Sequence, residues 1–453
     1  MTQSSGSRLA VLAVTVALVL SACAAPPDGN GRNVDPGALQ APVGADAGAT
    51  YPFPSSSADA PSMVNSPSVP SAGGTPAAPP STATLNQVKP STMSPASTPA
   101  STSNSPLPSP IARASSIVYY PAAGNPDGTA PVPAAAAAED VSHPDHVVGT
   151  GTPQSCTVDA LAAAVRGGGV TTFNCGPSPI TITLDRTLVT CNTDTCQHPW
   201  QGGTKVTKAV IDGGGLVTLN GNDQRGIFYA NTCEESFGWL SSRCDLETTP
   251  LVVFQNIVLA GGNATNGPTG YAGVGGGGGG GAIAMRGGQF KAVNVTFADN
   301  RCMTLASDGG GGAVRLTGQT ATSYIVHSTF VDNKCANGGA ISGLGASIQV
   351  LNSRIAGNSA TGTGASSGQG GNGGGIYGDG NTYSFVVDGT VISGNFADEG
   401  GPGIFYVSND RTGTLTIRNS QIVDNSGENF YTAPYRDIFY LGGGLTVTGS
   451  TVQ

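Results

Sequence analysis

Side chains able to carry out acid–base chemistry are sparse in this sequence. Charged residues make up 10% of the 453 positions, and there are four histidines. His327 is the histidine that lies among the repeats described below. Imidazole titrates near neutral pH, so His327 is the first candidate for a general acid or base. However, it lies three residues before Phe330, where other repeats carry Asn256, Asn294, Asn352 and Asn419. This alignment favours a polar turn position with a structural role.

The other charged candidates are carboxylates and guanidinium groups. Asp299, Asp332 and Asp424 each precede an asparagine of the repeat, and the first two should lie on adjacent coils. Such a pair indicates either a Ca²⁺ site, the only cofactor suggested by the sequence, or an exposed acidic turn. Asp223, Arg225 and Arg315 are further charges at positions that we expect to be exposed. These residues form no recognisable catalytic constellation, and we assign no catalytic residue.

The cysteines indicate an exported, disulfide-braced protein. Setting Cys23 aside leaves eight, an even number. Cys302 and Cys335 occupy the same point of adjacent repeats, so we predict a disulfide between them. By proximity we also favour the pairs Cys156–Cys175, Cys191–Cys196 and Cys233–Cys244. A zinc site at Cys191, Cys196 and His198 is the weaker alternative, because structural zinc sites need tightly paired ligands.

The N-terminus reads as an export signal. An apolar run from Leu9 to Leu20 is too short for the roughly 20 residues of a membrane-spanning helix, and it ends in Leu20-Ser21-Ala22-Cys23. This ending resembles the bacterial lipobox, which implies cleavage after residue 22 and attachment of a diacylglycerol to Cys23. We therefore expect residues 1–22 to be a lipoprotein signal peptide. An ordinary secretory signal is the alternative. The expected location is a lipid anchor in the bacterial cell membrane or outer membrane, with the protein exposed at the surface.

Residues 23–150 are rich in Pro, Ser and Ala and show no hydrophobic periodicity. Such a chain buries too little apolar surface to offset its ordering entropy, so we predict a disordered stalk followed by a folded domain at 151–453. The net charge of −9 argues against a nucleic-acid partner, which would require clustered Lys and Arg.

The folded region contains a repeat. Phe297, Asn300 and Cys302 return as Phe330, Asn333 and Cys335, always 33 residues later (330 − 297, 333 − 300 and 335 − 302). A fixed period of 20 to 50 residues is typical of solenoids, in which each unit stacks on its neighbour. The motif of an apolar residue three positions before an asparagine occurs five times: Phe297/Asn300, Phe330/Asn333, Ile355/Asn358, Ile392/Asn395 and Ile422/Asn425.

Each residue of this motif suits a parallel coil. The apolar residue should point inward and stack on its equivalent about 4.8 Å away, and Asn should form a hydrogen-bonded ladder while tolerating a left-handed turn. The residue before it should point outward; this row is Val258, Thr296, Thr329, Arg354, Val391 and Gln421. We expect the row to form a mildly polar sheet face. A helix at Val158–Arg166, capped by Thr157, should close the N-terminal end of the stack.

A second motif, Gly-Gly-Ala followed by Ile or Val, recurs after the first, as at Gly339-Ala340-Ile341. Together the two motifs resemble the repeats of the polymorphic outer membrane proteins, over about residues 250–450. The resemblance implies an all-β fold, a right-handed parallel β-helix of the pectin-lyase-like type. Those proteins end in a membrane-embedded β-barrel, whereas this sequence stops at Gln453, so we expect the N-terminal lipid to serve as the anchor.

The function expected from the resemblance is binding or adhesion at the cell surface, with a polysaccharide or another cell-surface molecule as ligand. The alternative is a carbohydrate-active enzyme, most plausibly a polysaccharide lyase, because this type of fold hosts both classes. The sequence lacks the lyase and hydrolase signatures sought, which are Trp-Ile-Asp-His, Arg-x-Pro-x-x-Arg, Gly-His-Gly and Arg-Ile-Lys. Binding is therefore the preferred hypothesis.

Overall fold

The computed structural model describes residues 122–190, 206–232, 246–266, 278–307, 309–365, 368–427 and 429–453. The predicted signal peptide, the lipid-bearing Cys23 and the stalk up to residue 121 lie outside these ranges. So do Cys191, Cys196, His198, Cys233 and Cys244, and with them two of the predicted disulfides and the zinc alternative. Within the described ranges, none of the helices has the length and apolar character needed to cross a membrane.

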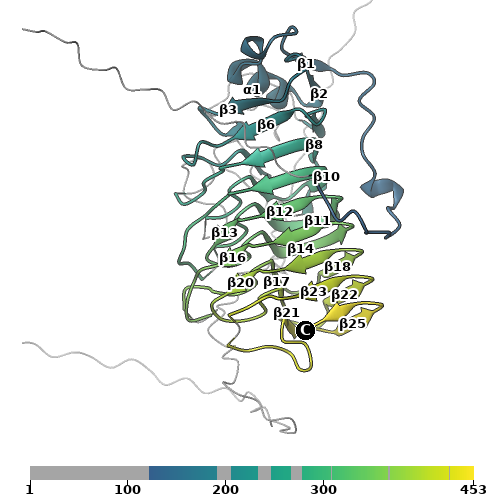
Figure 1. The fold of residues 1–453 in the computed structure, drawn as a ribbon, viewed down its shortest axis with the longest axis vertical. Coiled ribbons are helices and arrows are strands. Elements are labelled where there is room, and N and C mark those ends of the chain that lie inside the picture. The colour runs from purple at the N-terminus through teal and green to yellow at the C-terminus, as the bar shows by residue number, and fades with distance from the viewer. Residues whose placement is uncertain are drawn as a thin grey trace, which may run out of the picture. The chain divides into compact units, whose positions relative to one another are not determined.

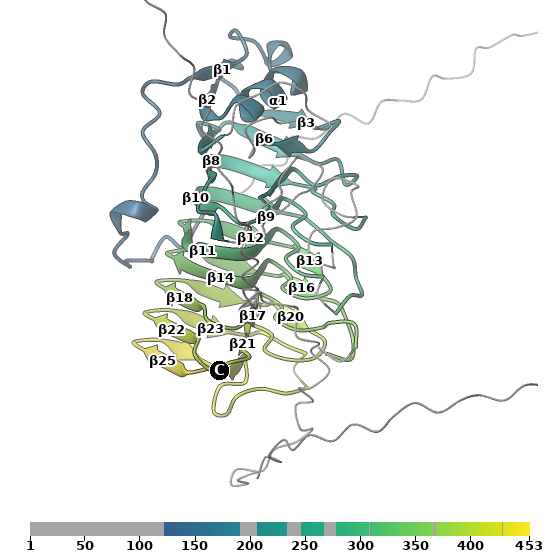
Figure 2. The ribbon, with the colours of Figure 1, turned by 180° about the vertical axis from the view of Figure 1, so that it is seen from behind.

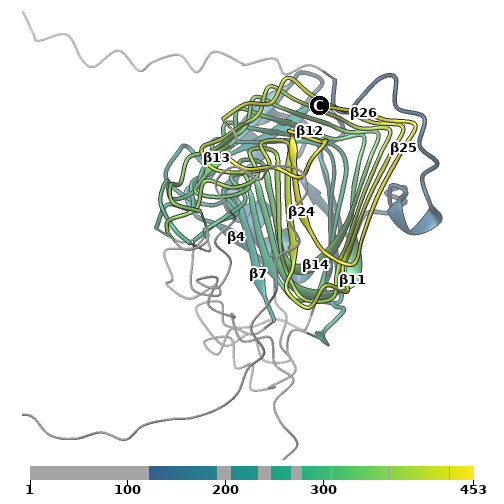
Figure 3. The same ribbon diagram turned by 90° about the horizontal axis from the view of Figure 1, so that it is seen from below.

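The described residues form a right-handed parallel β-helix whose strands pair in register from coil to coil (Figure 1). Each coil passes through three faces, which we call A, B and C, and the coils superpose when viewed along the stack (Figure 3). Long strands β8 (Leu251–Ala260) and β10 (Gln289–Ala298) run from face A into face B. Strands β11 (Val314–Val326) and β14 (Ile341–Leu351) run from face C into face A.

The remaining strands belong to one face each. Face A also holds β1 (His146–Val148), β2 (Gly169–Phe173), β5 (Lys208–Asp212), β18 (Ser384–Asp388), β22 (Thr414–Arg418) and β25 (Gly444–Thr448). Face B holds β3 (Ile180–Thr183), β6 (Val217–Asn220), β12 (Thr329–Val331), β15 (Arg354–Ala356), β19 (Val391–Ser393), β23 (Gln421–Val423) and β26 (Thr451–Val452). Face C holds β4 (Leu188–Val189), β7 (Phe228–Asn231), β9 (Ile283–Arg286), β17 (Ile376–Gly380), β21 (Ile404–Ser408) and β24 (Ile438–Leu441).

A small second sheet flanks the stack between faces B and C (Figure 2). It consists of β13 (Lys334–Cys335), β16 (Ser359–Ala360) and β20 (Phe396–Ala397). Cys335 belongs to β13, and Cys302 of the preceding coil lies at disulfide distance from it, with a Cα separation of 4.7 Å. The predicted link between adjacent coils is therefore confirmed.

A short helix closes the N-terminal end, as the sequence predicts. Helix α1 (Val158–Gly167) begins where the Thr157 side chain accepts a hydrogen bond from the amide of Ala160, which satisfies one of the free N–H groups of the first turn. Leu161 and Val165 are buried against the first coils. The 3-10 helix η3 (Pro153–Ser155) precedes α1, and Cys156 lies at disulfide distance from Cys175, with a Cα separation of 5.7 Å.

The repeated apolar residues form the core of face B. Phe297 is in register with Phe330, and their rings stack with centroids 4.4 Å apart and planes inclined by 10°. The column continues through Ile355, Ile392 and Ile422, all fully buried. Stacking of like residues follows directly from the parallel register, because equivalent positions of successive coils must lie above one another.

The predicted asparagine ladder is present, but a neighbouring residue takes the left-handed conformation. The side-chain amide of Asn300 donates to that of Asn333 over 2.9 Å, and the same contact links Asn333, Asn358, Asn395 and Asn425 in turn. The positive φ values belong to the preceding residues: 54° at Asp299, 56° at Asp332 and 58° at Asp424. A buried ladder residue is held by its amide contacts, so the turn falls on the exposed position before it, where Asp or Gly tolerates it.

A second ladder, not predicted from the sequence, is made of hydroxyl groups two residues before the stacked apolar position. The Ser353 hydroxyl accepts from the amide of Ser328 over 3.1 Å, and Thr390 and Ser420 continue the series. These residues are buried. Each hydroxyl therefore satisfies a backbone N–H group at the corner between faces A and B.

Residues 122–150, predicted from their composition to belong to the stalk, have a defined conformation. The chain from 122 to 145, which we call the strap, runs along face A from the level of β14 to the first coil and contains the 3-10 helix η2 (Ala134–Ala136) (Figure 1). Strand β1 then extends the sheet beside β2. The strap gains order from contacts with the coils, a contribution that its Pro- and Ala-rich composition does not reveal.

Candidate binding surface

Face B carries the outward row predicted from the sequence, but only part of that row is accessible. Thr296 and Thr329 are 3% and 4% exposed. The Thr329 hydroxyl accepts a hydrogen bond of 2.8 Å from the amide of Gly124 in the strap. The expectation of an open face along the whole row is therefore wrong at these two coils, and at Thr329 the strap is the physical reason.

The open part of the row begins at Arg354. Arg354, Val391, Gln421 and Thr451 are in register on β15, β19, β23 and β26. Arg354, Gln421 and Thr451 are exposed, and Val391 is half-buried. The parallel outward row two residues later contains small or short side chains, namely Ala356, Ser393 and Val423. The result is a nearly flat strip with a hydrogen-bonding side chain on three of its four coils, which we call the face B strip.

Acidic residues occupy several of the turns that end the strands of face B. Asp299, Asp332 and Asp424 are exposed at the end of their strands. Partial burial, followed by the negative charge of Asp332, raises the pKa of the Asp299 carboxyl above its ordinary value. The predicted proximity of these two like-charged residues is thus confirmed. Among the described residues, no group of three His, Cys, Asp or Glu side chains has an arrangement able to hold a metal ion.

The other charged candidates do not converge on one site. His327 is exposed with a φ of 45°, and Asn256, Asn294, Asn352 and Asn419 have φ between 46° and 55°. It therefore occupies the predicted turn position. Asp223 forms an ion pair of 2.8 Å with Arg301, and Arg225 donates to the carbonyl of Leu184.

Arg315 is 1% exposed on face C, so its expected exposure is wrong. Its outward direction does not make it accessible, because Gly279 and Gly310 in the connecting loops approach this part of the face closely.

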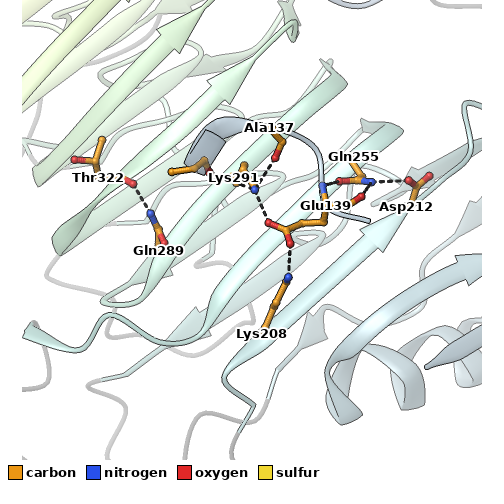
Figure 4. A network of polar contacts seen from close by, with 9 residues as sticks. Ala137, Glu139, Lys208, Asp212, Gln255, Gln289, Lys291 and Thr322 are labelled. Carbon is orange, nitrogen blue, oxygen red and sulfur yellow. Dashed lines mark hydrogen bonds and ion pairs between the residues drawn. The ribbon is translucent and has the colours of Figure 1, made fainter. Parts of the chain in front are cut away.

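A partly buried ion-pair network fixes the strap to face A (Figure 4). The Lys291 side chain is 3% exposed, and its ammonium group binds the Glu139 carboxylate and the carbonyl of Ala137, the latter at 2.7 Å. Lys208, on β5, pairs with the other carboxylate oxygen of Glu139. Burial would raise the pKa of Glu139, but the hydrogen bonds and charges of Lys208 and Lys291 outweigh it and hold the pKa below its ordinary value.

Sequence reasoning missed this network, although two signals for it were present. Val293, Val326 and Leu351 form an apolar outward row on face A, and Lys291 lies two residues before the first of them. An apolar outward row on a solenoid predicts a covering segment. The identity of that segment could not be inferred, because Glu139 lies 152 residues away from Lys291 in the sequence.

Comparison with known proteins finds no matching family model, no matching curated sequence and no matching solved structure. The fold alone defines the class of this protein, which is a parallel β-solenoid with a helix-capped N-terminal end.

Proposed function

We propose that this protein is a surface-displayed binding module that is anchored by a lipid on Cys23 and recognises a polysaccharide or another extended cell-surface ligand. The face B strip is the observation that carries the proposal. Its outward residues repeat once per coil, so a ligand lying along the stack meets an equivalent position about every 4.8 Å. Arg354 and Gln421 supply donors for hydroxyl, carboxylate or amide groups of such a ligand.

The anchor and the stalk support display at a distance from the membrane. The lipobox-like ending at Cys23 and the Pro-, Ser- and Ala-rich sequence that follows it favour a tethered module. About 100 residues of flexible chain have a root-mean-square span of roughly 50 to 60 Å. A binding module at that distance reaches past the lipid headgroups to ligands in the surrounding envelope.

A binding assay with the full chain tests the proposed ligand class. The protein is incubated with immobilised acidic and neutral polysaccharides, and both retention and chain cleavage are followed. We expect saturable retention on at least one polysaccharide and at least a roughly tenfold loss of affinity in Arg354→Ala/Gln421→Ala, since two charged or polar contacts are removed. Arg411→Ala is the matched control, because Arg411 is exposed on the turn between faces C and A.

Two results would contradict the proposal. Products with unsaturated ends would identify a polysaccharide lyase in place of a binding module. Equal loss of retention in the face B variant and in Arg411→Ala would show that the ligand does not lie on the face B strip.

The anchor is tested separately by Cys23→Ser in cells that express the full chain. We expect the wild-type protein to incorporate labelled fatty acid and to sediment with membranes, and the variant to do neither. If the wild-type protein carries no labelled fatty acid and is released to the medium, the N-terminus is an ordinary secretory signal. That result would not contradict the proposed ligand binding, which the assay above tests independently.

A further inference from the structure

The outward side of face A has an unusual composition under the strap. Val293, Val326 and Leu351 lie in register on β10, β11 and β14 and are each at most 9% exposed. They pack against Ala136 of η2, which is itself fully buried. The strap thus rests on a continuous apolar stripe.

Two side-chain amides of face A each hold the backbone of one strap residue. The Asn352 carboxamide accepts from the amide of Ala130 over 2.7 Å and donates to the carbonyl of the same residue over 2.9 Å. Gln255 makes the same pair of contacts with Glu139, at 2.9 and 3.1 Å. Such contacts recognise an extended chain through its backbone, so they do not depend on the side chains of the bound segment.

Sequence selectivity comes from three other positions. The Lys291 ammonium, buried on face A, requires an acceptor such as the Glu139 carboxylate. Gly124 and Gly128 pass so close to the coils that a Cβ atom on either would lie 2.8 Å or less from backbone atoms of His327 or Gly389. The surface therefore selects a glycine-containing extended segment with a carboxylate nine residues after the clamped alanine (139 − 130).

We propose that the surface formed by Gln255, Lys291, Val293, Val326, Leu351 and Asn352 is a peptide-binding site, occupied in this structure by the chain's own strap and able to accept the same segment from a second copy. Residues 124–139 make the contacts with this surface. None of these contacts depends on the covalent link between the strap and β1. Exposed residues Ser142 and His143 join the two parts and serve as a hinge. Exchange of the strap between neighbouring molecules would link them as domain-swapped pairs.

The test uses the full chain with a specific protease site inserted between Ser142 and His143. After cleavage, we expect the N-terminal fragment to co-elute with the β-helix on gel filtration. A fluorescent peptide of residues 122–142 should then bind saturably and displace the fragment. The uncut protein should bind this peptide far more weakly, because the tethered strap competes at high effective concentration.

Peptide variants test the contacts without perturbing the β-helix. Gly128→Ala should weaken binding about tenfold or more, because its Cβ would meet the carbonyl of Gly389 at 2.7 Å. Thr129→Ala, at the adjacent exposed position, is the matched control and should bind within about twofold of the wild-type peptide. In the protein, Lys291→Met keeps the apolar stem and should also weaken binding about tenfold. Its melting curve shows whether it is folded.

Loss of the fragment on cleavage together with failure of the peptide to bind would overturn the proposal, as would equal affinity of the Gly128→Ala and Thr129→Ala peptides.

Discussion

At the scale of single residues, asparagine occupies a buried position because both ends of its amide are used. Asn333 accepts from the backbone amide and the side chain of Asn300, at 3.0 and 2.9 Å. Its own amide group donates to the carbonyl of Phe297 and to the side chain of Asn358. An apolar residue would leave these buried partners unsatisfied, which costs more than a hydrogen bond contributes on average.

Asn333→Ala should therefore lower the free energy of unfolding by about 3 kcal/mol, since at least two buried donors lose their acceptor. Denaturant unfolding followed by circular dichroism measures the change. Asp332→Asn is the matched control, because the adjacent exposed turn keeps a residue that tolerates positive φ, and it should change the value by less than about 0.5 kcal/mol. Equal effects of the two substitutions would argue against an energetic role for the ladder.

At the scale of elements, the strap is held by contacts that differ from those between coils. Adjacent coils pair through continuous backbone hydrogen bonds, whereas the strap is held by side-chain clamps, one ion-pair network and the backbone bond from the amide of Asn125 to the carbonyl of Asn352. The Glu139 side chain is 18% exposed and the Lys291 side chain 3% exposed, so this network is screened less than a surface pair. The strap should consequently open before the coils do, and its stability should depend on pH.

Glu139→Gln tests that dependence. Because the folded-state pKa of Glu139 is lowered, its carboxylate stabilises the strap above the ordinary value near 4.5, and this contribution is lost as the pH falls through the folded-state pKa. At pH 7 the variant should show about fivefold lower amide protection across residues 124–138, which corresponds to about 1 kcal/mol. The difference from wild type should shrink as the pH is lowered below about 4.5.

Hydrogen exchange, corrected for the intrinsic rate at each pH, provides the measurement. Asp127→Asn places the same chemical change on an exposed position of the strap and should leave protection unchanged. A pH-independent difference between wild type and Glu139→Gln would mean that the ion pairs do not hold the strap.

At the scale of the whole molecule, the β-helix is a linear stack in which each coil contacts its neighbours. Stability is then a sum of coil and interface contributions, and damage in one coil should spread mainly to the coils beside it. The inter-coil contact of Cys302 with Cys335 and the cap formed by α1 limit fraying in the regions that they join.

Phe330→Ala should reveal this local coupling. Removal of a fully buried ring that stacks on Phe297 should cost about 3 to 5 kcal/mol, as large-to-small core substitutions do. We expect amide protection to fall in β10, β12 and β15 and to change little in α1. Val391→Ala, at a half-buried outward position, is the control. A uniform loss of protection over all coils would show that the stack unfolds as one cooperative unit.

The sequence by itself determined the solenoid, the Phe297–Phe330 stack, the asparagine ladder, the turn position of His327 and the pairing of Cys302 with Cys335. These features are readable because a repeat places residues 33 positions apart directly above one another. The repeat in the sequence therefore specifies contacts between residues on adjacent coils. The Thr157 cap of α1 is predictable for a different reason, since its hydrogen bond spans only three residues.

The tertiary structure alone decided the course of residues 122–145, the burial of Thr329 and Arg315, and the network joining Glu139 to Lys291. The repeat relates neither Gly124 to Thr329 nor Glu139 to Lys291. The strap also has the composition of an unfolded chain, with no period that could indicate where it would pack. Its conformation is fixed by an apolar stripe and two amide clamps that exist only after the coils have stacked, and these contacts therefore leave no signature in the strap's own sequence.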